Sequence, residues 1–312
     1  MSATLSPRTE QFIDSRPILD DPEALQARLA EKGYLFVRGL LPVAEILDVR
    51  RQILQVLDGH GWVAAGTDLM DGIADVEAYS RVPQEDIDFC GVGVGAQAYG
   101  EIYRLEAFHQ LSHHPALIGL YGSLFGGPVL AQPRNIARVM IPSELGVPTP
   151  PHQDFIHIQG SKKTMTAWLP LGDCPVDLGA LTALAGSQKD GVLSYKQVEG
   201  PGGLEAYLCE MDYPWAIGDF EAGDVLTFTC ETVHRALPNE HADRIRLSAD
   251  FRYQPADEPI NEGSLEPHCN VDTWDNIYAG WRNEALKYYW RDEKLQFSEW
   301  DESIRWQKNR IC

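Results

Sequence analysis

A histidine and an aspartate two residues apart, His152 and Asp154, are the first candidates for chemistry in this 312-residue chain. On an extended chain, residues i and i+2 point to the same side, so the pair can present an imidazole and a carboxylate to one metal ion. Taken alone, a His-x-Asp pair is common and is more often two surface polar residues. The pair becomes informative when a third ligand follows.

A third candidate ligand, His234, follows the apolar, β-rich run of residues 223–230. Two imidazoles and one carboxylate on one face form a facial triad, which suits non-haem Fe(II) and leaves coordination positions open. Each residue also has an ordinary structural role, as a hydrogen-bonded core histidine or, for Asp154, as a helix cap. The order His-x-Asp, strands, His and then a basic strand favours the metal site.

The basic strand, residues 244–251, carries Arg246 and Ser248 two positions apart and therefore on one face. A guanidinium with a hydroxyl beside it can bind a carboxylate through two or more hydrogen bonds. Such a clamp suits the far end of a dicarboxylic cosubstrate. Arg244 has the same parity and is the rival clamp, although we expect an exposed strand charge there. Arg252 shares the parity but lies nearer the strand's exit.

The elements around these residues change character along the chain. Helices are predicted over 24–32, from Pro42 onward, over 96–111 and over 115–124, with a buried strand over 34–39. Alternating strands are predicted over 129–131, 135–141, 155–158, 165–171 and 178–184, followed by an irregular insertion over 197–220. An aromatic-rich helix is expected over 274–291. This is an α+β pattern built on a β-sandwich or barrel.

The chain is expected to form one domain, because no Pro/Gly/Ser-rich linker divides it. Its expected parts are an N-terminal arm (1–20), a mainly helical flank (21–127), a strand-rich core (128–255) and a C-terminal helical extension (256–312). His109, His113 and His114 are interpreted as a polar cluster at a helix end, because adjacent histidines cannot point their rings the same way.

Composition excludes several partners. A formal net charge of −20 argues against nucleic acid and anionic membranes, which both need basic patches. No apolar run approaches a membrane span, and residues 1–8 contain no apolar signal segment. The six cysteines show no CxxC spacing, so neither a zinc knuckle nor a disulfide framework is readable. A reducing, cytoplasmic location is therefore expected.

With these residues in place, the chain resembles the phytanoyl-CoA dioxygenase family of Fe(II)- and 2-oxoglutarate-dependent oxygenases. The resemblance runs from about residue 33 to residue 255. The matching segments are His152-Gln153-Asp154, 166–171, Gly179-Ala180-Leu181 leading to Gly186-Ser187, Gly223-Asp224-Val225, His234 with Pro238-Asn239, and Arg246-x-Ser248. Relatives often have Pro and His where this chain has Ala185 and Gln188, which alters a loop and not the ligands.

The resemblance implies a double-stranded β-helix core (a jelly roll, cupin-like) flanked by helices. It implies that His152, Asp154 and His234 hold Fe(II), and that Arg246 and Ser248 bind the distal carboxylate of 2-oxoglutarate. Halogenases similar to the family replace the ligand carboxylate with a small residue, so the aspartate favours hydroxylation or a related oxidation.

Gln153 and Trp168 fall at positions that line the cofactor pocket in relatives. The implied reaction couples O2 and 2-oxoglutarate, with release of succinate and CO2, to attack on an unactivated C–H of a small organic substrate. Secondary metabolism is the expected setting. Desaturation, epoxidation and cyclisation share the same oxidising step and stay open beside hydroxylation.

Two other classes of function stay open. One is a jelly-roll binding protein without turnover, and the other is a Zn-dependent cupin-like hydrolase or isomerase. The Arg246-x-Ser248 pair argues against a hydrolase, which has no need of a dicarboxylate clamp. The substrate pocket is expected to be shaped by residues 71–100, by 197–220 and by the C-terminal helix. No motif in them identifies the substrate, and the pattern suits a monomer or a homodimer.

Overall fold

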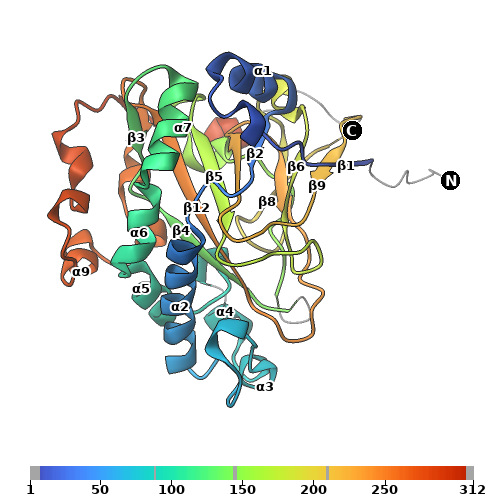
Figure 1. The fold of residues 1–312 in the computed structure, drawn as a ribbon, viewed down its shortest axis with the longest axis vertical. Helices are drawn as coiled ribbons and strands as arrows, with labels where there is room; N and C mark the ends of the chain where they lie inside the picture. The colour runs from blue at the N-terminus through green and yellow to red at the C-terminus, as the bar shows by residue number, and fades with distance from the viewer. Residues whose placement is uncertain (1–7, 88, 143–145, 209–210, 307–312) are drawn as a thin grey trace.

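Two β-sheets face each other, and helices cover the outer face of the larger one (Figure 1). The computed structural model describes residues 8–87, 89–142, 146–208 and 211–306. The larger sheet has the order β2-β10-β5-β12-β3, with β4 also paired to β12, and the smaller sheet has the order β1-β9-β6-β11. The jelly-roll core flanked by helices that the sequence predicts is confirmed.

The strands are short except for β12, which crosses the larger sheet. Those of the larger sheet are β2 (Tyr34–Val37), β3 (Val129–Ala131), β4 (Ile136–Met140), β5 (Met165–Pro170), β10 (Val225–Thr229) and β12 (Arg246–Pro255). Those of the smaller sheet are β1 (Thr9–Gln11), β6 (Leu181–Leu184), β9 (Trp215–Ile217) and β11 (His234–Ala236). Two further pairs are β7 (Tyr195–Gln197) with β8 (Leu204–Ala206) and β13 (Ile260–Asn261) with β14 (Phe297–Ser298).

The helices precede the strand-rich core for the most part. They are α1 (Pro22–Lys32), α2 (Val43–Gly59), α3 (Val76–Ser80), α4 (Gln84–Ile87), α5 (Ala96–Tyr103), α6 (Glu106–Ser112), α7 (Pro115–Phe125), α8 (Phe155–Ile158) and α9 (Trp274–Tyr278). The apolar stripe of α2 packs into the same core as the outer face of the larger sheet. One apolar core therefore joins the helical flank to the sheet.

Strand β12 has two faces of opposite character. Leu247, Ala249 and Phe251 join the apolar core beneath the helices. The residues between them are equally buried but polar, and they face the space between the sheets; these are Arg246, Ser248, Asp250 and Arg252. Because side chains alternate along a strand, a single strand supplies both core packing and a row of buried polar groups.

Several predicted elements are confirmed. Helix α1 begins after Asp21, whose side chain accepts a hydrogen bond from the Ala24 amide, and ends at Gly33 in the left-handed conformation. The histidine cluster is structural: His109 contacts the Tyr103 carbonyl (2.8 Å), and His114 caps α7. Within the described part of the chain, the groups that could hold a metal do not include these histidines.

Other predictions are wrong at the level of single elements. Residues 155–158 form the short helix α8 instead of a strand, because four apolar residues carry no readable period. The expected helix over 96–111 breaks into α5 and α6, and at the break the Arg104 carbonyl accepts a hydrogen bond from Trp281. The expected arm contains β1, which pairs in parallel with β9. The insertion over 197–220 contributes β8 and β9 and is therefore not wholly irregular.

The expected helix over 274–291 is limited to α9 and separate 3-10 turns. The Glu106 carboxylate accepts hydrogen bonds from the backbone N–H groups of Arg282 and Asn283, which are thereby withdrawn from a helical ladder. Tyr288 has a φ of 53°, which a regular helix excludes. The first seven residues of the arm and the last six of the C-terminal extension lie outside the described residues.

The structure pairs Cys90 with Cys269 in a disulfide, with Cα atoms 6.5 Å apart. The cysteine spacing did not reveal this pair, because partners 179 positions apart leave no signature in local spacing. Cys174 and Cys230 are buried free thiols, and Cys209 and Cys312 lie outside the described residues.

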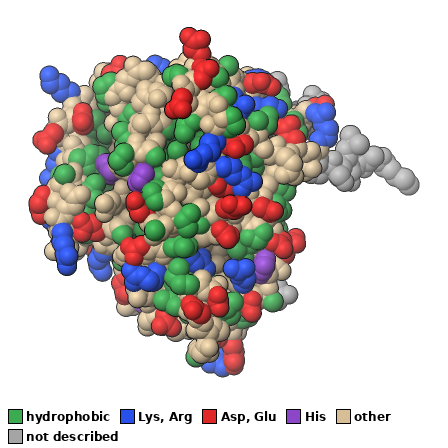
Figure 2. Space-filling view, in the orientation of Figure 1, with side chains coloured by type: hydrophobic (Ala, Val, Ile, Leu, Met, Phe, Trp, Pro, Cys, Tyr) green, Lys and Arg blue, Asp and Glu red, His purple; other side chains and the backbone are tan. Residues whose placement is uncertain are grey.

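The surface mixes charges of both signs. Figure 2 shows acidic and basic side chains interspersed over one face, without a continuous basic stripe on the side in view. In the described parts of the chain, no helix combines the length and the apolar character that crossing a membrane requires.

Candidate metal centre and cosubstrate cavity

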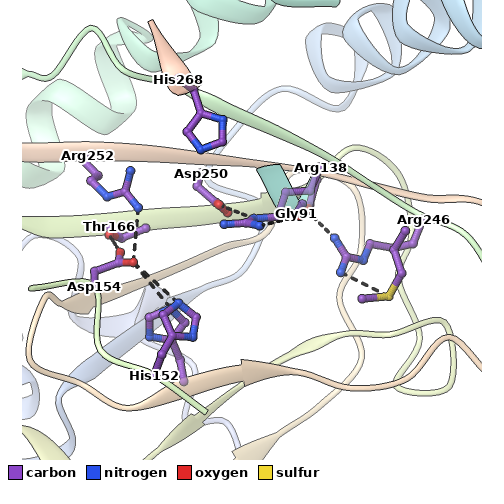
Figure 3. Close-up of polar contacts among 12 residues, drawn as sticks. Gly91, Arg138, His152, Asp154, Thr166, Arg246, Asp250, Arg252 and His268 are labelled. Atoms are coloured by element: carbon purple, nitrogen blue, oxygen red, sulfur yellow. Dashed lines mark hydrogen bonds and ion pairs between the residues drawn. The ribbon is translucent and has the colours of Figure 1, made fainter. Parts of the chain in front are cut away.

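The structure brings the three predicted metal ligands together. His152 and His234 lie side by side because their backbones exchange two hydrogen bonds, of 3.0 and 2.9 Å, and their ring centroids are 4.2 Å apart. Asp154 turns back toward them at the start of α8, and its Oδ1 lies 3.9 Å from the Nε2 atom of each histidine. Figure 3 shows the carboxylate directed at the histidine rings. Two nitrogens and one oxygen thus converge on one point.

Backbone carbonyls fix the orientation of both rings. Nδ1 of His152 lies 2.8 Å from the Pro150 carbonyl oxygen, and Nδ1 of His234 lies 3.0 Å from that of Thr232. A carbonyl only accepts, so each Nδ1 carries the proton and each Nε2 offers a lone pair. Burial lowers the pKa of His152 to about 3 and also lowers that of His234. Both rings are therefore neutral, as metal ligands must be.

Asp154 is held as an anion by two buried neighbours. The Thr166 hydroxyl donates to its Oδ2, and Arg252 donates to its Oδ1 at 3.2 Å. Burial alone would raise the pKa of the carboxyl group, but the Arg252 guanidinium, with the adjacent rings and the hydroxyl, holds it well below its usual range. Thr166 and Arg252 face each other across the β5–β12 register. Two adjacent strands therefore position the same carboxylate.

Arg246 is a buried cation without a carboxylate partner among the described residues. Its side chain is 3% exposed, and one terminal nitrogen donates to the Ser248 hydroxyl at 2.5 Å. The other contacts the Met140 sulfur at 3.4 Å, and Nε has no partner. Its carbon Cζ lies 5.8 Å from the centre of the Trp168 ring. A buried guanidinium is costly unless an anion pairs with it, so this group is prepared for a carboxylate.

The triad and Arg246 open into one cavity, which we call the metal cavity. Its empty volume is about 370 Å³, including the part open to solvent. Its lining comprises Arg138, Thr149, His152, Asp154, Thr166, Trp168, Leu181, Phe228, His234, Ala236, Arg246 and Asp250. Two neutral imidazoles and a carboxylate fit Fe(II), and a free guanidinium on the same cavity fits the far end of a dicarboxylate. The donor set therefore suits the metal and the cosubstrate together.

Two sequence-predicted residues are not brought to this cavity. Gln153 points the other way from its two neighbours: it donates to the carbonyls of Gly191 and Glu231 and accepts from the Leu193 amide and the Tyr195 hydroxyl. Because neighbouring side chains in an extended segment point to opposite sides, the residue between His152 and Asp154 points away from the metal. Arg244, the rival clamp, lines a different cavity, so of the two candidate clamps it is Arg246 that shares a space with the triad.

Sequence reasoning missed Thr166, Arg138 and Asp250, and it set Arg252 aside. Arg138 donates from Nε to Asp250 at 2.6 Å and from a terminal nitrogen to the Gly91 carbonyl at 3.3 Å. The sequence pattern could have indicated Asp250 and Arg252, because they lie at alternate positions after Arg246 and Ser248. They therefore share the polar face of a strand whose other face is apolar. Thr166 had no comparable signal.

A second cavity adjoins the metal cavity and shares Arg138, Thr149 and Arg246 with it. We call it the apolar chamber, because most of its other walls are hydrophobic. These walls include Ile87, Val92, Val139, Ile141, Val147, Pro148 and Pro201. Two of the three segments expected to shape a substrate pocket, 71–100 and 197–220, contribute to it. The C-terminal helix is not among the described residues that line it.

The comparisons with known proteins agree with this geometry. The sequence profile of the phytanoyl-CoA dioxygenase (PhyH) family matches residues 29–247. A 1-deoxypentalenic acid 11-beta-hydroxylase from Streptomyces arenae is 28% identical over 82% of this chain and 89% of its own length. The hydroxylase of the same name from Streptomyces exfoliatus is 28% identical over 86% of this chain and 92% of its own.

Solved structures share the fold. The epimerase SnoN in complex with Fe3+, alpha ketoglutarate and nogalamycin RO superposes with a TM-score of 0.54 at 22% identity, over 77% of this chain and 86% of that one. The alpha ketoglutarate dependent carbocyclase SnoK from nogalamycin biosynthesis gives 0.51 at 22% identity, over 76% and 85%.

Proposed function

Because the chain belongs to the phytanoyl-CoA dioxygenase family of Fe(II)- and 2-oxoglutarate-dependent oxygenases, we propose that it hydroxylates an unactivated C–H of a small organic substrate in specialised metabolism. The observation that carries the proposal is the metal cavity, in which three converging ligands and one unpaired buried arginine face the same space. A hydrolase gives no reason for that arginine.

Each residue of the metal cavity has a definite task in this proposal. His152, Asp154 and His234 hold Fe(II), and Arg246 with Ser248 binds the distal carboxylate of 2-oxoglutarate. When bound, the metal and cosubstrate activate O2 and supply the oxidising power, with succinate and CO2 as coproducts. The chain's own contribution is to orient the ligands, to bind the dicarboxylate and to exclude water from the reacting C–H.

Trp168 closes the metal cavity beside the clamp. Its ring is 1% exposed, lines the cavity and packs edge-on against Phe220 with centroids 4.8 Å apart. We assign it to the wall that confines the cosubstrate between the metal and Arg246. Gln153 instead ties together the loops behind the ligands and does not touch the cosubstrate.

The apolar chamber is the proposed place of the substrate. It meets the metal cavity at Arg138 and Thr149, so a molecule in the chamber can present one carbon to the metal. Apolar walls select a substrate with a hydrophobic body. The Streptomyces relatives are named as hydroxylases of 1-deoxypentalenic acid. The carboxylate ligand Asp154 favours oxygen insertion over halogenation.

The helical flank and the jelly roll are proposed to act as one oxygenase domain, because the core under the larger sheet is shared between them. We further propose that the protein works on a freely diffusing small molecule, as a monomer or a homodimer, without a nucleic-acid or membrane partner.

The test is anaerobic addition of Fe(II) and then 2-oxoglutarate, followed by O2. We expect a weak visible charge-transfer band that needs both additions, and succinate formation that is lost in Asp154→Ala. A substrate from a panel of hydrophobic acids is then expected to gain one oxygen atom from labelled O2. Metal binding without a band or succinate would refute the oxygenase.

A matched pair of variants separates the chamber from the metal cavity. Val147→Phe narrows the chamber from an exposed wall without touching the ligands, so we expect a raised substrate KM and unchanged substrate-free succinate release. Val43→Phe, the same change at an exposed position outside the chamber, serves as the control and should alter neither quantity. Equal effects of both variants would remove the chamber from the proposal.

A further inference from the structure

Arg50 is a second buried guanidinium that the proposed reaction does not use. It lies on the apolar stripe of α2, is 7% exposed, and donates to the carbonyls of Met70 (3.2 and 3.0 Å) and Leu171 (3.2 Å). Two glycines make room for it: a Cβ would lie 2.6 Å from a terminal nitrogen at Gly72 and 3.2 Å from the other at Gly172. Its three hydrogen bonds use three of five N–H donors.

Carbonyl dipoles do not cancel a full charge. Among the described residues Arg50 makes no ion pair, although removing an unpaired charge from water costs several kcal/mol. Burial, and then the positive charge of Arg244, lower the pKa of Arg50, while the carboxylates of Asp173 and Asp71 act in the opposite direction. Two like charges therefore lie near each other in a partly buried place, and the nearby carboxylates of Asp71 and Asp173 are exposed and form no ion pair with either arginine. An additional anion between the two guanidinium groups would relieve their repulsion.

Arg244 reaches the same place from the strand side. It is half-buried, and its side chain makes neither a hydrogen bond nor an ion pair with the described residues. It opens into a cavity that we call the arginine pocket, whose polar lining is Arg50, Arg244, Arg246 and Asp173. The carboxylate in that set, Asp173, is exposed and accepts a hydrogen bond from the Ala222 amide at 2.9 Å.

We propose that Arg50 and Arg244 form a binding site for a small oxyanion, separate from the cosubstrate site. Two free donors on Arg50 and five on Arg244 match the acceptors of a carboxylate, sulfate or phosphate group. Arg246 lines both the arginine pocket and the metal cavity and stands between them. The chain has a net charge of −20, so a cluster of positive side chains is unexpected from its composition. Such a cluster attracts anions, and we expect an anion to occupy the pocket.

The site can be tested with sulfate as the probe. The full-length, metal-free protein is titrated with sodium sulfate at constant ionic strength, with chloride as the replaced ion, while thermal unfolding is followed. Wild type is expected to show a saturable rise in Tm, about 2–4 °C at ten times the dissociation constant. Arg244→Gln should lose the rise. Arg51→Gln, a surface arginine one position further on α2 and paired with Asp48, should keep it.

The alternative location of sulfate is the metal cavity, and Arg246→Gln tests it. If sulfate binds at Arg50 and Arg244, Arg246→Gln should keep the saturable rise in Tm and Arg244→Gln should lose it. The reverse pattern, or no saturable rise in wild type, would overturn the proposal. Arg50→Met, with a native circular dichroism spectrum, should also lose the rise in Tm. Agreement between the two variants would show that the loss does not come from a folding defect in one of them.

A parallel titration with acetate identifies the oxyanion class. A rise with acetate that depends on Arg244 assigns the site to carboxylates as well, and a rise with sulfate alone assigns it to tetrahedral oxyanions. Because the readout needs neither iron nor turnover, failure of this site leaves the oxygenase proposal standing, and failure of the oxygenase leaves this site standing.

Discussion

Replacing Arg246 with glutamine is the sharpest test of the cosubstrate site. The guanidinium is 3% exposed, holds the Ser248 hydroxyl, and keeps Nε without a partner. Glutamine fits the same space and can still bond the hydroxyl, but it brings no charge. The distal carboxylate of 2-oxoglutarate would then enter a buried cavity without its counter-ion.

The expected loss follows from the burial of that pair. Removing one partner of a buried ion pair typically costs about 3–5 kcal/mol, because the remaining charge stays desolvated. Each 1.4 kcal/mol is a factor of ten, so the affinity for 2-oxoglutarate should fall by roughly 100- to several-thousand-fold. Binding of Fe(II) itself should not weaken, because the three ligands are untouched.

The assay is anaerobic titration of the Fe(II)-loaded protein with 2-oxoglutarate, read from the midpoint of the charge-transfer band. Arg244→Gln is the matched control, since it removes the same group two positions before the start of β12 and outside the metal cavity. Its midpoint should stay within about twofold of wild type. An Arg246→Gln midpoint close to wild type, or equal shifts in both variants, would refute the reasoning.

Three further predictions follow from hydrogen bonds and a covalent link. Thr166→Val removes the hydroxyl that holds Asp154 and should weaken Fe(II) affinity about 10- to 100-fold in a metal titration, with native circular dichroism retained. Gln153→Leu leaves buried groups unpaired and should lower the free energy of unfolding by about 2–4 kcal/mol in urea. The 2-oxoglutarate midpoint of the folded variant should be unchanged. A shifted midpoint with unchanged stability would place Gln153 in the cavity. A reductant should destabilise wild type by about 2–4 kcal/mol but leave a Cys90→Ser, Cys269→Ser double variant unaffected, and equal responses would contradict the disulfide.

The sequence was informative wherever chemistry follows strand parity. Spacing placed His152 and Asp154 on one side and Arg246 with Ser248 on another shared face. The structure brings His152, Asp154 and Arg246 to one cavity, and Ser248 accepts a hydrogen bond from Arg246. The same rule applied to Gln153 puts its side chain behind the ligands, whereas the resemblance to relatives suggested the pocket. Local geometry was the better guide at that position.

What the sequence could not supply were pairings between distant segments. The bridge that places His152 beside His234, the register that sets Thr166 opposite Arg252, and the link between Cys90 and Cys269 all join residues far apart in the chain. Local patterns also cannot reveal a competing partner, such as the Glu106 carboxylate that withdraws backbone donors from the expected C-terminal helix. The hydrophobic period of a segment predicts which face of a strand or helix a residue occupies, but it does not predict which residue of another segment lies opposite.

The charges around the metal cavity explain why metal and cosubstrate should bind together. Arg138 pairs with Asp250 and Arg252 pairs with Asp154, so both carboxylates are already matched by guanidinium groups. Arg246 is left over, and the histidines are neutral, which gives the empty site one net positive charge. Fe(II) alone would raise that charge by two in a buried space, whereas the 2-oxoglutarate dianion restores it to its starting value. Each should therefore tighten the binding of the other, and by linkage the two enhancement factors must be equal. Measuring Fe(II) affinity with and without 2-oxoglutarate, and 2-oxoglutarate affinity with and without Fe(II), checks this directly. In Arg246→Gln the empty site is neutral. Fe(II) should still bind more tightly when 2-oxoglutarate is present, but the affinity for 2-oxoglutarate without the metal should fall.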